Sequence, residues 1–195
     1  MGMQQLTPLQ VLQERGRALA RANSWKRLAG SLLCTLACTL ILFGLLFGVA
    51  VIHGDSMNPA FRHNDLVLFS RLGRYSIGGR AMGNYGAGDV VILKADGEAR
   101  SLRKYVKRVA GVPGDTVDIN FEGGVYVNGE PLEDLYAQGF TRREDGAEFP
   151  FLLAQGEYFV LGDNREHSSD SRSFGAVTSG SIEGKVIAVL RTRRP

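Results

Sequence analysis

A run of 25 residues without a charge, residues 28–52, constrains this chain more than any other feature of its sequence. It reads LAGSLLCTLACTLILFGLLFGVAVI, and its only hydroxyl groups are those of Ser31, Thr35 and Thr39. A helix needs about 20 predominantly apolar residues to cross the roughly 30 Å hydrocarbon core of a bilayer. The run therefore predicts a transmembrane helix.

Two other interpretations of the run are weaker. A buried core helix of a globular domain rarely lacks charge on every side over such a length. A cleaved secretory signal would fit the small residues at positions 48 and 50, but the apolar part of such a signal spans only about 7–15 residues. We therefore expect an uncleaved membrane anchor.

The charges on either side of the run predict its orientation. Residues 1–27 carry five basic residues and one acidic residue, whereas residues 53–195 carry 18 basic and 19 acidic residues. Because basic flanks stay on the cytoplasmic side, we expect a cytoplasmic basic tail (1–27), a single span of the cytoplasmic membrane (28–52) and an extracytoplasmic domain (53–195). That domain is nearly neutral and has no basic stripe with interleaved aromatics, which argues against nucleic-acid binding.

Cysteine usage restricts the chemistry of the part beyond the membrane. Cys34 and Cys38 are the only cysteines, and both fall in the predicted span. Small, soft side chains in a span are commonly packing residues. The domain that follows is expected to fold without disulfides, and neither a cysteine cluster nor an HExxH motif predicts a zinc site.

Beyond residue 52 the sequence changes to short apolar runs separated by glycine. Such runs, rich in β-branched and aromatic residues, are typical of strands. The dipeptide Asn128-Gly129 adds a hairpin turn. We predict a mainly β domain, built as a folded-over sheet or partial barrel. Its strands are expected over residues 65–69, 89–93, 102–110, 116–121, 124–127, 158–161 and 182–191.

The first candidate for chemistry is the stretch HGDSMNPAF, residues 53–61, directly after the apolar run. Gly54 permits a tight, positive-φ turn and Pro59 stiffens its exit. Such a turn can expose the hydroxyl of Ser56 and aim backbone N–H groups at one point. A serine hydroxyl is a weak nucleophile until a base removes its proton, so the chain must also supply that base.

A lysine is a better candidate for the base than a histidine. The three histidines lie in no recognisable triad signature and are most simply surface residues: His53, His63 and His167. In the run SLRKYVKRVA, strand alternation places Lys107 on the same face as Tyr105 and Val109, which favours it over Lys104 for a dry site. Desolvation or a nearby positive charge, such as that of Arg108, would have to lower the lysine pKa from about 10.4. A solvated edge lysine fits the same pattern.

The third candidate is the polar stretch GDNREHSSDSR, residues 162–172, which follows an apolar strand. Three acidic residues, two arginines and three serines within 11 residues predict a loop with internal ion pairs at a strand end. Functional residues concentrate on loops that a scaffold holds in this way. An ordinary hydrated turn has the same composition, so the residues alone leave both interpretations open.

Taken together, three motifs resemble those of bacterial signal peptidase I, the family of membrane-anchored serine endopeptidases that remove signal peptides from exported preproteins. The motifs are GDSMNP at 54–59, YVKRVAGVPGD at 105–115, and GDNR at 162–165 continuing to Ser168, Asp170, Ser171 and Arg172. Their order and approximate spacing cover most of residues 53–185, and the anchor precedes them as in the family. The resemblance implies a mostly β peptidase fold with an extended hydrophobic surface resting on the membrane.

The resemblance also implies roles for individual residues. Ser56 would be the nucleophile and Lys107 its general base, a Ser-Lys arrangement in place of a histidine triad. Ser168 would lie near the lysine ammonium and orient it. The supporting groups would share one loop: Asp163 and the ion pair of Asp170 with Arg172. No metal or organic cofactor is implied.

One position departs from the pattern of some family members. They carry a serine two positions before the nucleophile, and its hydroxyl supplements the oxyanion hole, whereas this chain has Gly54. We therefore expect the backbone N–H of Ser56 to contribute most of the oxyanion stabilisation. A single donor in other serine hydrolases is worth about 2.7–4 kcal/mol.

Two rival functions are compatible with parts of the sequence. A self-cleaving Ser-Lys repressor-type peptidase has a related β fold, but it would carry a DNA-binding helix-turn-helix in place of the apolar run. A membrane-anchored binding module without catalysis would tolerate substitution of Ser56 or Lys107. The peptidase interpretation predicts secretory preproteins and membrane lipid as partners, and it makes no prediction of the oligomeric state.

Overall fold

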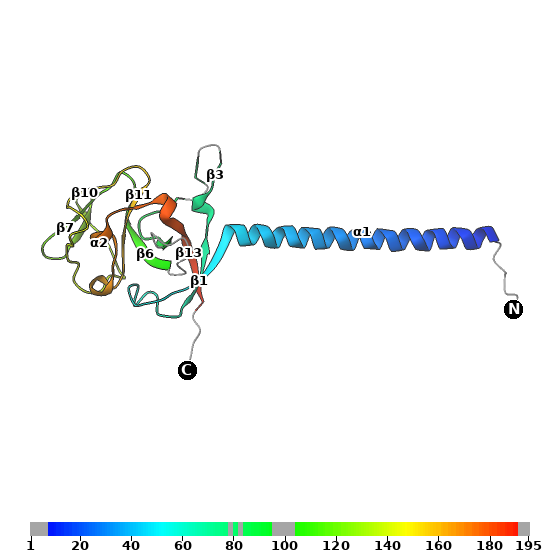
Figure 1. The fold of residues 1–195 in the computed structure, drawn as a ribbon, viewed down its shortest axis with the longest axis horizontal. Coiled ribbons are helices and arrows are strands. Elements are labelled where there is room, and N and C mark those ends of the chain that lie inside the picture. Colours follow the sequence, from blue (N-terminus) through cyan, green and yellow to red (C-terminus); the bar gives the residue numbers. More distant parts are fainter. Residues whose placement is uncertain (1–7, 78–79, 82–83, 95–103, 191–195) are drawn as a thin grey trace. The chain divides into compact units, whose positions relative to one another are not determined.

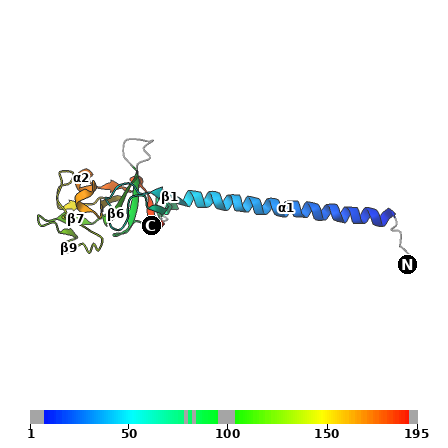
Figure 2. The same ribbon diagram turned by 90° about the horizontal axis from the view of Figure 1, so that it is seen from below.

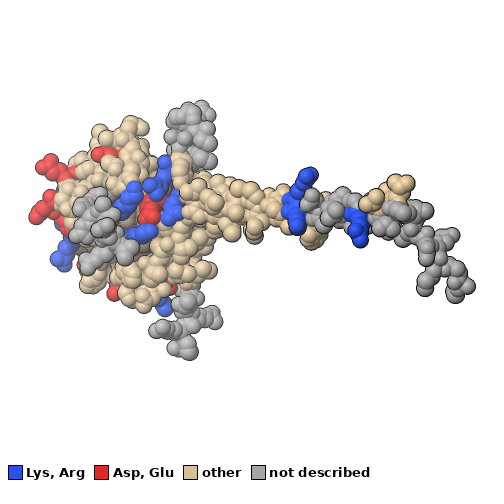
Figure 3. Space-filling model, turned by 45° about the vertical axis from the view of Figure 1, so that its right-hand side comes forward, with Lys and Arg blue, Asp and Glu red and all other residues tan. Residues whose placement is uncertain are grey.

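The computed structural model describes residues 8–77, 80–81, 84–94 and 104–190. The chain divides into two units, Met1–Leu45 and Leu46–Pro195. Helix α1 (Pro8–Leu46) makes up the first unit, and its stretch Ser24–Leu46 is long and apolar enough to cross a membrane. The described lysines and arginines of this helix gather toward its N-terminal part, and the rest of it carries no charge (Figure 3). Of the predicted elements, residues 1–7, 102–103 and 191 lie outside the described residues.

The helix ends earlier than the predicted span of residues 28–52. It stops at Leu46, and Phe47–Val51 form strand β1, which pairs antiparallel with β2 (Leu66–Ser70). Ala50 is buried in the core of the second unit, whereas Val49 and Val51 are exposed. The prediction was wrong here because small and β-branched apolar residues suit a half-buried strand as well as a membrane helix.

The second unit is mainly β, as the sequence predicts, and is built around a seven-stranded antiparallel sheet. The strand order is β1-β2-β13-β5-β6-β11-β12. Its other members are β5 (Val90–Lys94), β6 (Lys104–Gly111), β11 (Glu157–Leu161), β12 (Val177–Thr178) and β13 (Ile182–Leu190). Among the strands that the structure describes, β1 and β12 are the two edges, so the sheet does not close into a barrel.

A second sheet of four strands has the order β10-β7-β8-β9. Its members are β7 (Thr116–Ile119), β8 (Val125–Val127), β9 (Glu130–Pro131) and β10 (Phe151–Leu152). Figures 1 and 2 both place this sheet at the end of the unit opposite β1. The remaining short elements are η1 (Leu72–Arg74), β3 (Ser76–Ile77), β4 (Arg80–Ala81), η2 (Arg165–His167), α2 (Ser171–Phe174) and η3 (Ser179–Ser181).

The central strand β5 is buried on both faces. Val90 and Ile92 belong to one apolar cluster and Val91 and Leu93 to another, as the alternation of a strand requires. The first cluster also contains Met57, from the turn that carries Ser56. Strand β6 pairs with β5 beside both clusters, so the core fixes the two segments that carry the candidate nucleophile and base.

Candidate active site

The Ser56 hydroxyl lies on a tight turn that follows β1. Gly54 has φ +90°, a backbone conformation that favours glycine, and the N–H of Asn58 closes the turn on the carbonyl of Asp55 at 3.0 Å. Met57 is 1% exposed and anchors the turn in the core, while Asp55 is exposed. Ser56 is therefore half-buried on a turn that the buried side chain of Met57 holds against the core.

No histidine shares a hydrogen bond with Ser56 among the bonds that the described residues form. His63 accepts the N–H of Gly54 through Nδ1 at 3.1 Å, and the ring centroids of His63 and His53 lie 5.7 Å apart. His167 is exposed at the end of η2. Within the described part of the chain, the geometry therefore offers no Ser-His pair.

The side chain of Lys107 reaches Ser56 from β6. Its Nζ atom lies 2.9 Å from Ser56 Oγ and 3.0 Å from Ser168 Oγ, and the residue is 2% exposed. Lys104, the other lysine of the strand, is partly exposed and forms an ion pair with Glu183 at 2.9 Å. Of the two lysines on this strand, the buried one contacts the serine hydroxyl.

Burial changes the acid–base behaviour of this lysine. Desolvation lowers the pKa of Lys107 from 10.5 to about 8, because the charged ammonium loses contact with water. Asp170 opposes that lowering of the pKa and Arg172 adds to it. Arg108, which the sequence offers as a source of positive charge, instead pairs with Asp163 at 2.8 Å. The neutral amine, the form that accepts a proton, is thus accessible slightly above neutral pH.

The loop that follows β11 is a buried ionic network and not a hydrated turn. Asp170 and Arg172 are 0% and 1% exposed and form an ion pair at 2.8 Å. The same aspartate accepts the N–H of Gly162 at 2.9 Å, and the arginine donates to the carbonyl of Ser168 at 3.2 Å. Charges buried this deeply persist only when paired and hydrogen-bonded. The network fixes Ser168, and with it one of the two hydroxyls that contact Lys107.

Sequence reasoning missed a second layer of support behind this loop. Arg165 is 3% exposed; its guanidinium donates to the carbonyl of Gly162 at 3.0 Å and to the hydroxyl of Thr141 at 2.8 Å, and it pairs with the carboxylate of Asp134. Arg165 is part of the GDNR motif, so the sequence could have identified it as a candidate supporting residue. Asp134 and Thr141 belong to a segment without any pattern, and only the fold brings them together.

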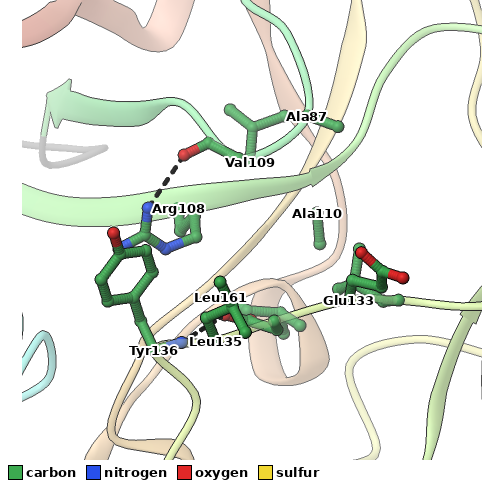
Figure 4. A pocket seen from close by; sticks show the side chains of 11 residues that line it. Ala87, Arg108, Val109, Ala110, Glu133, Leu135, Tyr136 and Leu161 are labelled. Atoms are coloured by element: carbon green, nitrogen blue, oxygen red, sulfur yellow. Dashed lines mark hydrogen bonds between the residues drawn. The ribbon is translucent and has the colours of Figure 1, made fainter.

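A pocket of about 320 Å³ is lined by Arg108, Val109 and Ala110 of β6 and by residues 132–136 (Figure 4). The guanidinium of Arg108 lies 4.4 Å from the ring centroid of Tyr136, and Leu161 forms part of the wall. Ser56 and Lys107 are not among the lining residues. The pocket therefore does not contain the candidate nucleophile or base. Among the described residues, no cluster of three or more His, Cys, Asp or Glu side chains could hold a metal ion.

Comparison with known proteins gives the class of the chain and then its family. A family described as "Signal peptidase, peptidase S26" matches residues 25–191. By class the chain is a serine endopeptidase with a mainly β catalytic domain. It belongs to the signal peptidase family, peptidase S26. This membership argues against both a repressor-type peptidase and a non-catalytic binding module.

Two relatives found by sequence agree with this assignment. Signal peptidase I S of Bacillus subtilis (strain 168) is 30% identical over 165 residues, which are 80% of this chain and 83% of that protein. Signal peptidase IB of Staphylococcus aureus is 35% identical over 150 residues, 69% of this chain and 73% of that protein. A solved structure of a signal peptidase I from Enterococcus faecalis V583 is 30% identical, with a TM-score of 0.43 over 54% of this chain and 98% of that chain.

Proposed function

We propose that this protein removes N-terminal signal peptides from secretory preproteins, with Ser56 as the nucleophile and Lys107 as the general base. One observation carries the proposal: a buried amine with a pKa of about 8 lies 2.9 Å from a serine hydroxyl. Nucleophilic catalysis by serine requires a base at this distance that is neutral near the working pH. The family membership supplies the substrate class.

The chemistry follows from these two side chains. Ser56 Oγ attacks the scissile carbonyl carbon while neutral Lys107 Nζ takes the hydroxyl proton. Collapse of the tetrahedral intermediate breaks the carbon–nitrogen bond, and Lys107 gives the proton to the leaving amine. A water molecule then attacks the Ser56 ester, with Lys107 as base again, and the proton returns to Ser56 Oγ. Ser168, 3.0 Å from Nζ, holds the amine in line throughout.

The developing oxyanion requires a donor, and the backbone N–H of Ser56 is our candidate. Gly54 has no side chain to add a second donor, and its own N–H donates to His63. The N–H of Ser56 forms no hydrogen bond among those of the described residues. This group is therefore available to the oxyanion when a substrate binds.

We also propose a single-pass arrangement in the cytoplasmic membrane. The basic tail, residues 1–27, would lie in the cytoplasm, the apolar part of α1 would cross the bilayer, and the catalytic domain would face the extracytoplasmic side in contact with lipid. The excess of basic residues before the span supports this orientation. Because β1 is part of the catalytic domain, the proposed span ends at Leu46 and not at residue 52.

Cleavage of a purified preprotein by the detergent-solubilised full chain tests the proposal. Wild type, Ser56→Ala and Lys107→Ala would be compared, with the mature product identified by mass. We expect wild type to cut after the signal peptide and both folded variants to release no product. Cleavage by Ser56→Ala would show that another group is the nucleophile, and a wild type without activity on any preprotein would overturn the proposed function.

A further inference from the structure

Asn164 holds both peptide groups that flank the candidate nucleophile. Its backbone N–H donates to the carbonyl of Ser56 at 3.0 Å, and its side-chain Nδ2 donates to the carbonyl of Asp55 at 3.2 Å. The two segments are 109 residues apart in the chain. A single residue therefore fixes consecutive carbonyls of the turn that carries Ser56.

The side chain of Asn164 makes this contact in place of a local one. The residue is the N-cap of η2, a position where asparagine commonly accepts a backbone N–H of its own helix. Here the side chain forms no such cap. Its Nδ2 donates to the other segment, so the side-chain hydrogen bond that Asn164 forms is the long-range one to Asp55.

The position of Asn164 is itself held from the opposite side. The backbone of Gln138 pairs with its two neighbours, donating to the carbonyl of Asp163 at 2.7 Å and accepting the N–H of Arg165 at 2.8 Å. Both neighbours are buried and ion-paired. A contact made from so constrained a residue can determine the geometry of a more exposed turn.

Peptide geometry carries the effect of Asn164 to the reactive centre. The bond between Asp55 and Ser56 is trans, so the carbonyl of Asp55 and the N–H of Ser56 belong to one plane and point in opposite directions. The carbonyl accepts two hydrogen bonds, from Asn58 N–H and Asn164 Nδ2. Holding the carbonyl directs the N–H, and each bond that it accepts polarises the peptide and strengthens the N–H as a donor.

We infer that Asn164 is a positioning residue for the oxyanion: its side chain aims and polarises the Ser56 N–H that stabilises the tetrahedral intermediate. The inference rests on the proposed function. It concerns a chain in which Gly54 supplies no hydroxyl, so the remaining donor carries a larger share of the stabilisation. Asn164 itself touches neither Ser56 Oγ nor Lys107 Nζ in any hydrogen bond of the described residues.

The test compares the full chain with Asn164→Ala and Asn164→Asp, both of which keep the backbone N–H but lose the side-chain donor. Gln138→Ala is the matched control, because it removes an exposed amide from the segment behind the same loop without removing a backbone bond. Six quantities would be measured: kcat and KM on a peptide substrate, the pH at half-maximal kcat/KM, inhibition by a peptide aldehyde that forms a tetrahedral adduct with serine, inhibition by the uncleavable product peptide, and the melting temperature.

We expect both Asn164 variants to lower kcat by about 10- to 100-fold, because they misalign a donor that remains present. Affinity for the aldehyde should fall by a similar factor. KM, product inhibition, the pH at half-maximal activity and the melting temperature should stay close to those of wild type and Gln138→Ala. This pattern separates loss of oxyanion stabilisation from general loosening of the turn.

Two results would overturn the inference. Unchanged kcat and aldehyde affinity in a folded Asn164→Asp variant would show that the side chain does not act on the oxyanion. Equal losses of aldehyde and product-peptide affinity would assign Asn164 a purely structural role. Wild type and Ser56→Ala in the same assay keep the proposed function separate: if wild type cleaves and Ser56→Ala does not, only the role of Asn164 is in question.

Discussion

At the scale of the residue, burial of Lys107 destabilises the folded protein at neutral pH. Lowering the pKa from 10.5 to about 8 corresponds to about 3 kcal/mol, since one pKa unit is about 1.4 kcal/mol. Below pH 8 the folded chain must hold a proton on a desolvated amine. Between pH 8 and 10.5 the unfolded chain binds more protons than the folded one, so stability rises with pH across that window.

Lys107→Met should therefore stabilise the protein at neutral pH while abolishing activity. An upper estimate of the gain is about 3 kcal/mol, reduced because the hydroxyls of Ser56 and Ser168 lose their shared partner. The gain over wild type should shrink as the pH rises from 7 to 9.5. Melting temperatures of the two solubilised chains at both pH values measure this, and a difference that does not change with pH would contradict the assigned cause.

The same pKa predicts the pH dependence of catalysis. In the proposed mechanism the neutral amine of Lys107 is the reactive form, so kcat/KM should rise with pH and level off above about 8. A histidine base would give a limb near 6.5. A pH profile of wild type, His53→Gln and His167→Gln measures this. A limb near 6.5 that disappears in either histidine variant would refute Lys107 as the base.

Gly162 tests how closely the loop approaches the reactive groups. A Cβ atom at this position would collide with the hydroxyl of Ser168 and lie 2.7 Å from the carbonyl of Ser56, closer than real contacts allow. Gly162→Ala should displace both serines from Lys107 and lower kcat by about 100-fold or more. Gly180→Ala, in η3, is the control for glycine replacement and should keep its kcat, because Gly180 has no positive φ and an added Cβ would meet only Thr178 Oγ1 at 3.8 Å.

At the scale of the element, strand β1 connects helix α1 to the turn that carries Ser56, the proposed nucleophile. Its five residues pair with β2, and its last core residue, Ala50, lies in the same cluster as Met57. Gly48 lies directly against the ring of Phe69, where a side chain would not fit. The strand is therefore part of the catalytic domain, and the domain begins six residues before the boundary predicted from hydropathy.

A chain beginning at residue 53 should consequently be less stable than one beginning at residue 47. The shorter chain leaves β2 as an unpaired edge and exposes the apolar groups that β1 and Ile52 cover. We expect a melting temperature lower by several degrees, or aggregation, because about 1 kcal/mol shifts the melting temperature of a domain of this size by roughly 2–4 °C. Equal melting temperatures of the two chains would mean that β1 adds nothing to the domain.

Elements built on local patterns were predictable, and those built on distant contacts were not. Strands β5, β7, β8 and β11 lie within a residue or two of the predicted ranges, because short apolar runs bounded by turn residues specify them locally. Strands β9, β10 and β12 have only two residues each, too few to form a recognisable apolar run, and each is defined by its pairing with a longer strand. In the site, alternation favoured Lys107 over Lys104. The contact of Arg165 with Thr141 and the contact of Asn164 with Asp55 depend on long-range pairing that no local pattern encodes.

At the scale of the whole molecule, one chain combines a helix long and apolar enough to cross a membrane with a catalytic domain that begins at the next residue. A preprotein with an apolar signal segment would share the same bilayer. Confining both partners to a surface raises their effective concentration without any new contact between them. The proposed anchoring thus increases the rate of encounter, while the chemistry at Ser56 and Lys107 is unaffected by it.

Dilution of the enzyme within the membrane should therefore slow cleavage of a preprotein in the same bilayer but not cleavage of a soluble peptide. The full chain and a preprotein would be reconstituted in vesicles at constant bulk concentrations while the amount of lipid is increased tenfold. Cleavage of the preprotein at subsaturating levels should fall roughly in proportion to the added lipid, because the encounter is confined to the surface. Cleavage of a short soluble peptide by the same vesicles should stay constant, which shows that the enzyme itself remains active. A rate of preprotein cleavage that does not change with the amount of lipid would mean that the substrate reaches Ser56 from solution and that α1 does not assist the encounter.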